Sequence, residues 1–225
     1  MSSSSTESRT LLVRELGRRA YEPIWRAMRD FTQTRTHATP DEFWLVEHDP
    51  VYTLGQVAKP EHLLAPGDIP VVRTDRGGQV TYHGPGQVVG YALFDLCRMQ
   101  VKVHEFVRRI EECMILVLAD HGVIGERWDG RPGVYVRTAK IGALGIRIRR
   151  GCTYHGLAFN VSMDPTPFHS INPCGMANLA VTQLSELAEV ESLHTVGRAL
   201  AHHVRDLFGF SSVRYTPDRW VAGTA

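Results

Sequence analysis

Short strand-like runs separated by proline and glycine dominate the first half of the chain, and they restrict it to folds that contain an extensive sheet. Such runs cover residues 11–16, 43–47, 71–74, 80–83 and 88–94. In the second half, three more cover residues 134–137, 144–149 and 157–161. We expect these runs to pair into a mostly antiparallel sheet.

Three longer segments show helical periodicity. In residues 21–35 the apolar residues on one side are Tyr21, Ile24, Trp25, Met28 and Phe31. In residues 103–121 they are Phe106, Val107, Ile110, Met114, Val117 and Leu118, with Gly122 just past the end. A last helix fits residues 193–208. Together with the sheet, these segments predict an α+β fold in which the helices pack against the sheet.

The composition is that of an ordinary globular chain, with 225 residues, 43% hydrophobic and 22% charged, which supports one sizeable core. We place a single domain at residues 11–215 and expect the polar, serine-rich residues 1–10 to form a disordered tail. The longest aliphatic run is too short to span a bilayer, and the N-terminal residues lack a signal-peptide pattern. A net charge of +1 gives no global case for nucleic-acid binding. We therefore expect a cytoplasmic monomer that binds neither membranes nor nucleic acid.

The four cysteines, at positions 97, 113, 152 and 174, have neither close pairing nor a CxxC spacing. They indicate neither a disulfide framework nor a zinc knuckle, so reduced thiols are expected. Cys113 falls within the helix of residues 103–121 and should be part of the core. Cys174 differs, because it lies between Pro173 and Gly175 and outside any apolar period. The proline and glycine predict a rigid turn that displays the thiol, although packing as a small hydrophobe is the alternative.

A glycine-rich stretch at residues 76–87 lies between strand-like runs. Its glycines allow the backbone to approach a ligand closely, and they open neither a P-loop nor a dinucleotide-binding turn. Arg76 contributes a guanidinium, and Thr81, Tyr82 and His83 contribute hydrogen-bonding groups beside an aromatic face. This mixture favours a binding loop over a structural hairpin.

Lys140 is one of only three lysines, beside 22 arginines, and it stands among small and apolar neighbours. A desolvated ammonium can lose a proton whereas a guanidinium stays charged, so a lysine kept in this setting suggests chemistry. A lysine that reaches solvent from the end of a strand is an equally good interpretation. Downstream, Ile146 and Ile148 alternate with arginines 147 and 149, which predicts one apolar face and one basic stripe continued by residue 150.

Two kinds of site remain open for the reactive residues. Cys152 and His155, together with His83 and Cys174, could supply four zinc ligands, although structural zinc sites usually use two close pairs. Alternatively, Cys174 is a nucleophile, and His83, His155 or Lys140 lies beside it to favour the thiolate. Sequence spacing does not choose among these three partners.

The chain resembles the lipoyl(octanoyl) transferases, also called lipoate-protein ligase B. The resemblance is carried by RGGQVTYHGPGQ at residues 76–87, KIGALGIRIRRGCTYHGLAFNV at 140–161 and INPCGM at 171–176, and it spans roughly residues 11 to 210. It implies a fold shared with lipoate and biotin protein ligases. It also implies transfer of an octanoyl group from acyl carrier protein to a lysine on lipoyl domains of 2-oxoacid dehydrogenases or on glycine cleavage H protein, with no cofactor and no metal.

The same resemblance assigns residue roles. Cys174 matches the thiol that accepts the acyl group, and Lys140 matches the lysine that activates it. Three segments match those that line the acyl tunnel and bind substrate: Arg76, Gly77, Gly78, Gln79, Val80, Thr81, Tyr82 and His83; Ala143, Leu144 and Gly145; and Gly156, Leu157 and Ala158. Two alternatives are kept: an ATP-dependent lipoate or biotin ligase, which needs no cysteine nucleophile, and a non-catalytic module that binds an acyl carrier or a metal.

Overall fold

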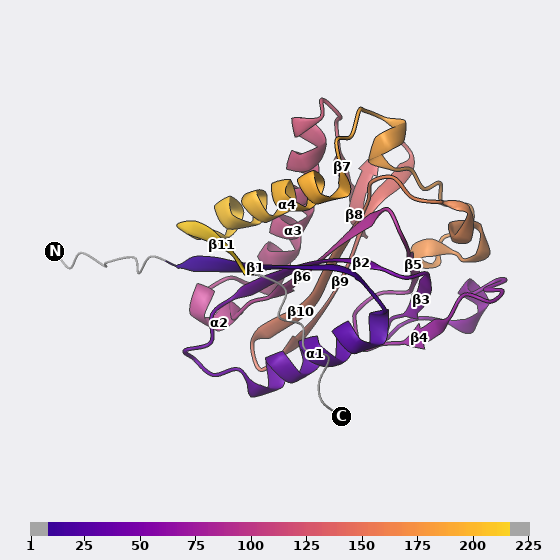
Figure 1. The fold of residues 1–225 in the computed structure, drawn as a ribbon. Helices are drawn as coiled ribbons and strands as arrows, with labels where there is room; N and C mark the ends of the chain where they lie inside the picture. Colours follow the sequence, from indigo (N-terminus) through magenta and orange to yellow (C-terminus); the bar gives the residue numbers. More distant parts are fainter. Residues whose placement is uncertain (1–8, 217–225) are drawn as a thin grey trace.

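The computed structural model describes residues 9–216, and within them the chain forms one large and one small sheet (Figure 1). The large sheet has eight strands in the order β11-β1-β2-β6-β10-β9-β8-β7. These are β1 (Thr10–Arg19), β2 (Glu42–His48), β6 (Gln87–Leu93), β7 (Glu126–Trp128), β8 (Arg131–Val136), β9 (Ala139–Arg149), β10 (Cys152–Asn160) and β11 (Ser212–Thr216). The small sheet has the order β4-β3-β5 and consists of β3 (Val51–Leu54), β4 (Val71–Arg73) and β5 (Val80–His83).

Most neighbouring strands run antiparallel, which confirms the expected sheet type. In the large sheet β1 is parallel to both β2 and β11, and every other neighbouring pair is antiparallel. In the small sheet β3 is parallel to β4 and antiparallel to β5. The fold is therefore α+β with a mixed, mostly antiparallel sheet.

Helices cover both faces of the large sheet (Figure 1). On one face α1 (Tyr21–Thr34) buries Ile24 and Met28 against Trp44, Val46 and Leu93. On the other face α3 (Val103–Asp120) and α4 (Leu193–Phe208) pack over the main core. The short helices are α2 (Leu96–Met99), η1 (Pro60–His62), η2 (Thr166–Ser170), η3 (Pro173–Gly175) and η4 (Leu184–Glu186). None of the helices in this described part has the length and apolar character that crossing a membrane requires.

The three predicted helices are confirmed to within one residue at each end, and Cys113 is buried in the core as expected. Strand boundaries were predicted less well. Strand β9 begins at Ala139, not at residue 144, because four of its first five residues are alanine, lysine or glycine, which are depleted in strands. The short strands β3, β7 and β11 were not predicted, although β4 and β5, which are equally short, were. Runs of three to five residues carry too little periodicity to be identified consistently. Residues 1–8 of the expected tail lie outside the described part.

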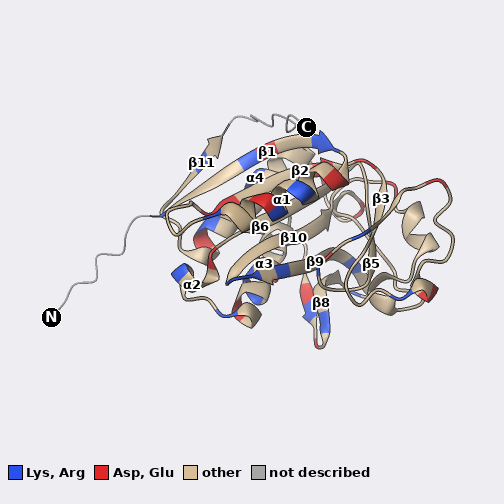
Figure 2. Cartoon of the chain, turned by 90° about the horizontal axis from the view of Figure 1, so that it is seen from below, with Lys and Arg blue, Asp and Glu red and all other residues tan. Residues whose placement is uncertain are grey.

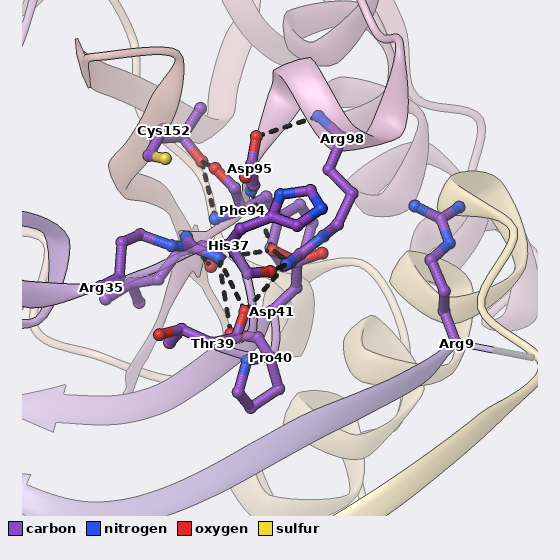
Figure 3. A network of polar contacts seen from close by, with 12 residues as sticks. Arg9, Arg35, His37, Thr39, Pro40, Asp41, Phe94, Asp95, Arg98 and Cys152 are labelled. Atoms are coloured by element: carbon purple, nitrogen blue, oxygen red, sulfur yellow. Dashed lines mark hydrogen bonds and ion pairs between the residues drawn. The ribbon is translucent and has the colours of Figure 1, made fainter. Parts of the chain in front are cut away.

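A buried ion network ties the segment between α1 and β2 to α2 (Figure 3). The Oδ1 atom of Asp41 lies 2.9 Å from Nη2 of Arg35 and 2.7 Å from Nη2 of Arg98, and Asp41 also accepts a hydrogen bond from the Asp95 N–H at 2.8 Å. Asp41 is buried, so the two guanidinium groups replace the water that its carboxylate loses on folding. The network fixes the chain where it enters β2.

A three-residue turn from β5 to β6 brings the small sheet against the large one. Gly86 has φ of +86°, and a Cβ atom there would lie 1.8 Å from the Ser162 carbonyl oxygen, so no other residue fits. Its N–H donates to Glu47 Oε1 at 2.8 Å, and its carbonyl accepts from Ser162 N–H at 2.9 Å. The turn therefore holds the end of the small sheet against the ends of β2 and β10.

Candidate active site

A cavity lies between the two sheets. Its volume is about 780 Å³ when the solvent-filled space at its open end is included. Its walls come from α1, the glycine-rich stretch with β5, strands β6, β9 and β10, and the segment that carries η2 and η3. Cys174 and Lys140, which are distant in sequence, both line it.

Two cross-strand pairs of small residues form part of the cavity wall. Ala143 on β9 pairs with Ala158 on β10, and Gly145 pairs with Gly156. Residues paired in this way, two positions apart, share one face of the sheet, so four adjacent positions carry at most a methyl group. From Lys140 to Gly145 this wall runs about 16 Å at roughly 3.3 Å per residue. The missing side chains leave a long and narrow space beside the thiol.

Cys174 is exposed and free, in the middle of helix η3. Its φ of 56° and ψ of 20° place it in the left-handed region, which is uncommon for a residue other than glycine. The turn closes through hydrogen bonds from the Gly175 N–H to the Asn172 carbonyl at 3.0 Å and from the Met176 N–H to the Pro173 carbonyl at 3.1 Å. The structure thus has the displayed thiol and tight turn that the Pro-Cys-Gly sequence predicts.

A second segment, residues 62–65, supports this turn, and no sequence pattern indicates it. The Asn172 N–H donates to the His62 carbonyl at 2.8 Å, and the Leu64 N–H donates to the Ser170 carbonyl at 2.9 Å. Leu63 and Ile171 form an antiparallel bridge between these bonds. The segment before Cys174 is therefore fixed by strand-like pairing with the loop that follows β3.

Lys140 is buried, and its Nζ atom lies 2.9 Å from Cys174 Sγ and 2.9 Å from the Pro132 carbonyl oxygen. Its backbone is held as well, because its N–H donates to the Ala180 carbonyl and its carbonyl accepts from the Thr182 N–H. Of the three partners considered for the thiol, Lys140 is the one within hydrogen-bond distance. It does not reach solvent from a strand end, so that interpretation was wrong.

His83 belongs to a buried chain of hydrogen bonds at one side of the cavity. Its Nδ1 lies 2.7 Å from Gln87 Oε1, and Gln87 Nε2 donates to Asn160 Oδ1 at 2.9 Å. Burial lowers the pKa of His83 to about 3, so the ring is neutral near pH 7. A neutral ring bound to Gln87 shapes the cavity and orients Asn160, whose amide donates to the Thr182 carbonyl.

His155 lines the cavity but is bound to Asp75, with Nε2 and Oδ1 3.0 Å apart. Burial acts to raise the pKa of Asp75, yet hydrogen bonds from His155, Tyr154 and Trp25 outweigh it and lower that pKa. For His155 itself, burial lowers the pKa despite the carboxylate beside it. Asp75 thus links β10, through His155, and α1, through Trp25, to the residue just before the glycine-rich stretch. Neither Asp75 nor His155 has a hydrogen bond to the thiol.

Arg76 is buried and directs its guanidinium at oxygen atoms of nearby residues. Nη2 donates to the carbonyl groups of Thr53 at 2.6 Å and Gln79 at 2.8 Å, and Nη1 donates to the Gly77 carbonyl at 2.9 Å. Burial lowers the pKa of Arg76, but a guanidinium stays charged in proteins. Its bonds hold the glycine-rich stretch in the shape that bounds the cavity.

Two of the predicted substrate-binding residues do not line the cavity, and the remaining ones do. Gly77 turns its N–H to the Ile146 carbonyl at 2.9 Å, on the strand beside it. Tyr82 alternates in direction with Thr81 and His83 along β5, and it packs against Tyr52 and Phe168. Both residues support the wall from behind.

The cavity also includes residues outside the predicted substrate-binding set, namely Tyr21, Gln87, Val89, Tyr91, Ile141, Gly142, His155, Asn160, Phe168, Pro173 and Val181. Most are buried residues of helices and strands that would be taken for core. The zinc alternative is not supported, because within residues 9–216 no group of three or more histidine, cysteine, aspartate or glutamate side chains is placed to hold a metal ion.

The basic stripe of β9 is only partly as expected. Ile146 and Ile148 pack against the main core, as the alternation predicts. Arg147 is partly buried and donates to Gln56 Oε1 at 2.7 Å, whereas Arg149 and Arg150 are exposed at the end of β9 farthest from Lys140. Figure 2 shows basic segments both on β9 and on the β8 hairpin.

Comparison with known proteins agrees with this architecture and these motifs. The lipoyl protein ligase A/B catalytic domain matches residues 21–205. An octanoyltransferase of Dechloromonas aromatica is 56% identical over 193 residues, 86% of this chain and 94% of the relative. One of Aeromonas hydrophila is 51% identical over 224 residues, 96% of each chain.

Solved structures share the fold at low sequence identity. A bi-partite lipoate protein ligase of Thermoplasma acidophilum has a TM-score of 0.73 and 15% identity, covering 94% of this chain and 86% of its own. The biotin protein ligase of Aquifex aeolicus has a TM-score of 0.51 and 9% identity, covering 89% and 69%. The chain therefore belongs to the lipoyl protein ligase A/B catalytic-domain family, and within it to the octanoyltransferases.

Proposed function

We propose that this protein transfers an octanoyl or lipoyl group from acyl carrier protein to a specific lysine of lipoyl domains through a thioester on Cys174, the first step of endogenous protein lipoylation. The observation that carries the proposal is the 2.9 Å contact between Lys140 Nζ and Cys174 Sγ beside a narrow cavity lined by small residues. The acceptors are the lipoyl domains of 2-oxoacid dehydrogenases and the glycine cleavage H protein. The relatives named octanoyltransferase support the acyl group and the reaction class.

In the first half-reaction the Cys174 thiolate attacks the carbonyl carbon of the octanoyl thioester carried by acyl carrier protein. The Lys140 ammonium favours that thiolate because opposite charges at this separation attract strongly where water is scarce. The bond from the carbonyl carbon to the carrier sulfur breaks, and Lys140 gives its proton to the departing sulfur. The products are an octanoyl thioester on Cys174 and a neutral Lys140 amine.

In the second half-reaction the amine of the acceptor lysine attacks the thioester on Cys174. An amide bond forms, the bond to Sγ breaks, and the proton lost by the attacking nitrogen returns to the Lys140 amine. The enzyme is left with the thiolate and ammonium with which it began. Lys140 therefore transfers a proton in both half-reactions from the same position, because its Nζ atom lies within hydrogen-bond distance of the Cys174 Sγ atom that gains and then loses the acyl group.

The cavity holds the acyl chain away from water during the transfer. The alanine and glycine pairs of β9 and β10 accept a straight apolar chain, and the Gln87 and Asn160 side chains are already bonded to each other. An enclosed chain limits the entry of water, which would otherwise hydrolyse the thioester. The reaction needs no cofactor, because the thioester of the donor already activates the acyl group.

The proposed catalytic domain comprises residues 11–215, and the proposed setting is the cytoplasm, where thiols stay reduced. The cysteines of the described part are all free, and the proposed nucleophile is exposed. An ATP-dependent ligase of the same fold is the second candidate, supported by the structural similarity to lipoate and biotin ligases. It does not account for the lysine placed against a displayed cysteine.

The intact mass of the full-length protein tests the proposal. After incubation with octanoyl-acyl carrier protein and without ATP, the protein should gain the mass of one octanoyl group, and Cys174→Ala should gain none. Cys97→Ala and Cys113→Ala are matched controls that should keep the adduct, because Cys97 lies away from the cavity and Cys113 is buried in the core. An adduct that persists in Cys174→Ala, or that forms only with ATP and free octanoate, would overturn the mechanism.

A further inference from the structure

The Lys140 ammonium is buried without a carboxylate partner. Within residues 9–216 no carboxylate lies within 4.0 Å of it, and its two hydrogen-bond partners are the Pro132 carbonyl and Cys174 Sγ. Burying a cation in this way is costly unless something else stabilises its charge. The other neighbour that can stabilise the charge is an aromatic ring, because Lys140 Nζ lies 5.3 Å from the centre of the Tyr135 ring.

Tyr135 is the inner member of a stacked column on the hairpin of β7 and β8. Its ring lies 4.1 Å from that of Trp128 with an interplanar angle of 1°, and the Arg131 guanidinium carbon lies 5.6 Å from the Trp128 ring centre. We call Trp128 and Tyr135 the aromatic column. Lys140 lies at its buried end and Arg131 at its exposed end, so the stack separates the two cations.

Helix α3 holds this hairpin in place. The buried Glu111 accepts a hydrogen bond from the Gly133 N–H at 2.9 Å and one from Arg127 Nε at 3.1 Å. Both donors belong to the strands that carry the column. The position of the Tyr135 ring relative to Lys140 is therefore set by the main core and does not depend on the Cys174 turn.

We propose that Tyr135 is a positioning residue, whose ring face, backed by Trp128, keeps the Lys140 ammonium charged and directed at Cys174. This rests on the proposed function, because it concerns the same Lys140 and Cys174 pair. An aromatic face attracts a cation without supplying an anion. A carboxylate in its place would form its own ion pair with the ammonium and weaken the attraction of that ammonium for the thiolate.

The ring, not the hydroxyl, carries the effect. The Tyr135 hydroxyl is buried without a hydrogen-bond partner, and burial raises its pKa to about 12, so it neither orients Lys140 nor ionises near neutral pH. Tyr135→Phe keeps the ring face and should behave like the parent protein. Tyr135→Leu keeps a side chain of moderate bulk and removes the ring face.

The rate at which iodoacetamide alkylates Cys174, followed by mass spectrometry across pH 5 to 10, tests the proposal on the full chain. We expect Tyr135→Leu to react about tenfold more slowly near pH 7 and its pH profile to move to higher pH, because less thiolate forms when the ammonium is less stable. Tyr135→Phe should keep the parent profile. Tyr215→Leu is the matched control, since the Tyr215 ring contacts Arg198 at 4.3 Å on a surface that does not line the cavity.

Two further measurements separate positioning from general loss of structure. In a Lys140→Ala background, Tyr135→Leu should cause no further change in alkylation rate, because the residue acts through Lys140. Trp128→Leu, which leaves Tyr135 in place without its backing ring, should shift the profile in the same direction and less. It also provides the test if Tyr135→Leu does not fold. An unchanged profile in a folded Tyr135→Leu, or an equal loss in Tyr135→Phe, would overturn the proposal.

Alkylation requires no acyl donor, so this result is independent of the transferase assay. If the parent protein forms no octanoyl adduct yet Tyr135→Leu shifts the alkylation profile, the proposed function fails and the positioning role stands. If the adduct forms and the profile does not move, the positioning role fails and the proposed function stands.

Discussion

Gly133 leaves the space that the end of the Lys140 side chain occupies. A Cβ atom at residue 133 would lie 2.7 Å from both Cε and Nζ of Lys140 and 2.7 Å from the Gly142 carbonyl oxygen. The φ of Gly133 is +131°, a conformation that few other residues adopt. The lysine thus reaches the thiol because its neighbouring strand carries no side chain at this point.

Gly133→Ala should displace the Lys140 ammonium from Cys174 and lower the rate of octanoyl transfer by at least about tenfold, since small misplacements of a reacting group are costly. Steady-state transfer to a lipoyl domain measures this. Gly130→Ala is the matched control, because Gly130 lies in the same hairpin with φ of +69° and has nothing within 4 Å of a Cβ. In both variants alanine at a positive φ strains the backbone of the hairpin. Equal losses of transfer rate in the two would therefore show that the effect comes from the hairpin and not from displacement of Lys140.

Lys140→Arg should keep the charge near Cys174 and still lose most of the turnover. A guanidinium stays protonated and cannot take the proton released by the acceptor lysine in the second half-reaction. Single-turnover experiments should therefore show an acyl adduct on Cys174 that forms but is passed on slowly. Near-normal turnover would reduce Lys140 to an electrostatic role.

How far the sequence predicts this site depends on whether the signal is local. The display of Cys174 was predictable because Pro173 and Gly175 act on its own turn. The contact with Lys140 was not, because 34 residues separate the two and the sequence offered His83 and His155 as equal partners. The two histidines are not partners of the thiol because both are buried and are bonded elsewhere, His83 to Gln87 and His155 to Asp75. A pattern of residue types shows neither their burial nor these bonds.

The same difference between local and long-range sequence signals applies to the fold. Helices were predicted almost to the residue because fourteen to eighteen residues carry several periods of the apolar pattern. Tyr82 was assigned to the cavity with its neighbours, but its ring packs against Tyr52 and Phe168 instead. Strand alternation does not predict this, because Val80 lies on the same side of β5 and does line the cavity. The long-range pairing of Leu63 with Ile171 had no local signal, since both lie in loops.

Ala143→Val should change the preference for acyl chain length. The Ala143 side chain faces the cavity beside its partner Ala158, so two added methyl groups narrow the space for the middle of a long chain. We expect kcat/KM for an octanoyl donor to fall about tenfold or more, and that for a butanoyl donor to fall much less, because a misplaced methylene costs on this scale. Equal losses for the two donors would mean that this wall does not contact the chain.

The stability of the fold should fall between pH 6.5 and about 4, in part because of His48. This buried ring bonds the Arg19 carbonyl and the Tyr91 hydroxyl, and burial lowers its pKa to about 4. In the window from 6.5 to about 4 the unfolded chain takes up a proton that the folded chain does not, so the folded state loses up to about 3 kcal/mol as pH falls. Above pH 6.5 the His48 ring is neutral in both the folded and the unfolded chain, so it adds no pH dependence to the stability.

Urea unfolding at several pH values, compared for the parent protein and His48→Gln, measures that contribution. The variant should be less stable at pH 7.5 yet lose less stability on going to pH 4.5, since glutamine does not titrate. Parallel curves for the two proteins would contradict the assignment to His48 and leave other groups responsible.

The docking of acyl carrier protein should depend on the exposed arginine in the turn before Lys140 more than on the far end of the β9 stripe. Arg137 is exposed in the turn between β8 and β9, three residues before Lys140, whereas Arg149 lies nine residues after it, about 30 Å along the strand at roughly 3.3 Å per residue. The family resemblance implies an acidic acyl carrier protein, and charges steer such a partner only over about 8 Å at physiological salt. We expect Arg137→Glu to raise the KM for octanoyl-acyl carrier protein several-fold at low salt and Arg149→Glu to raise it less.

A small octanoyl thioester has no acidic domain, so its kinetics should change little in either variant. Steady-state assays with both donors across a salt series provide the measurement. A larger effect of Arg149→Glu would identify the β9 stripe as the docking surface instead, and equal losses on both donors would indicate damage to the active site.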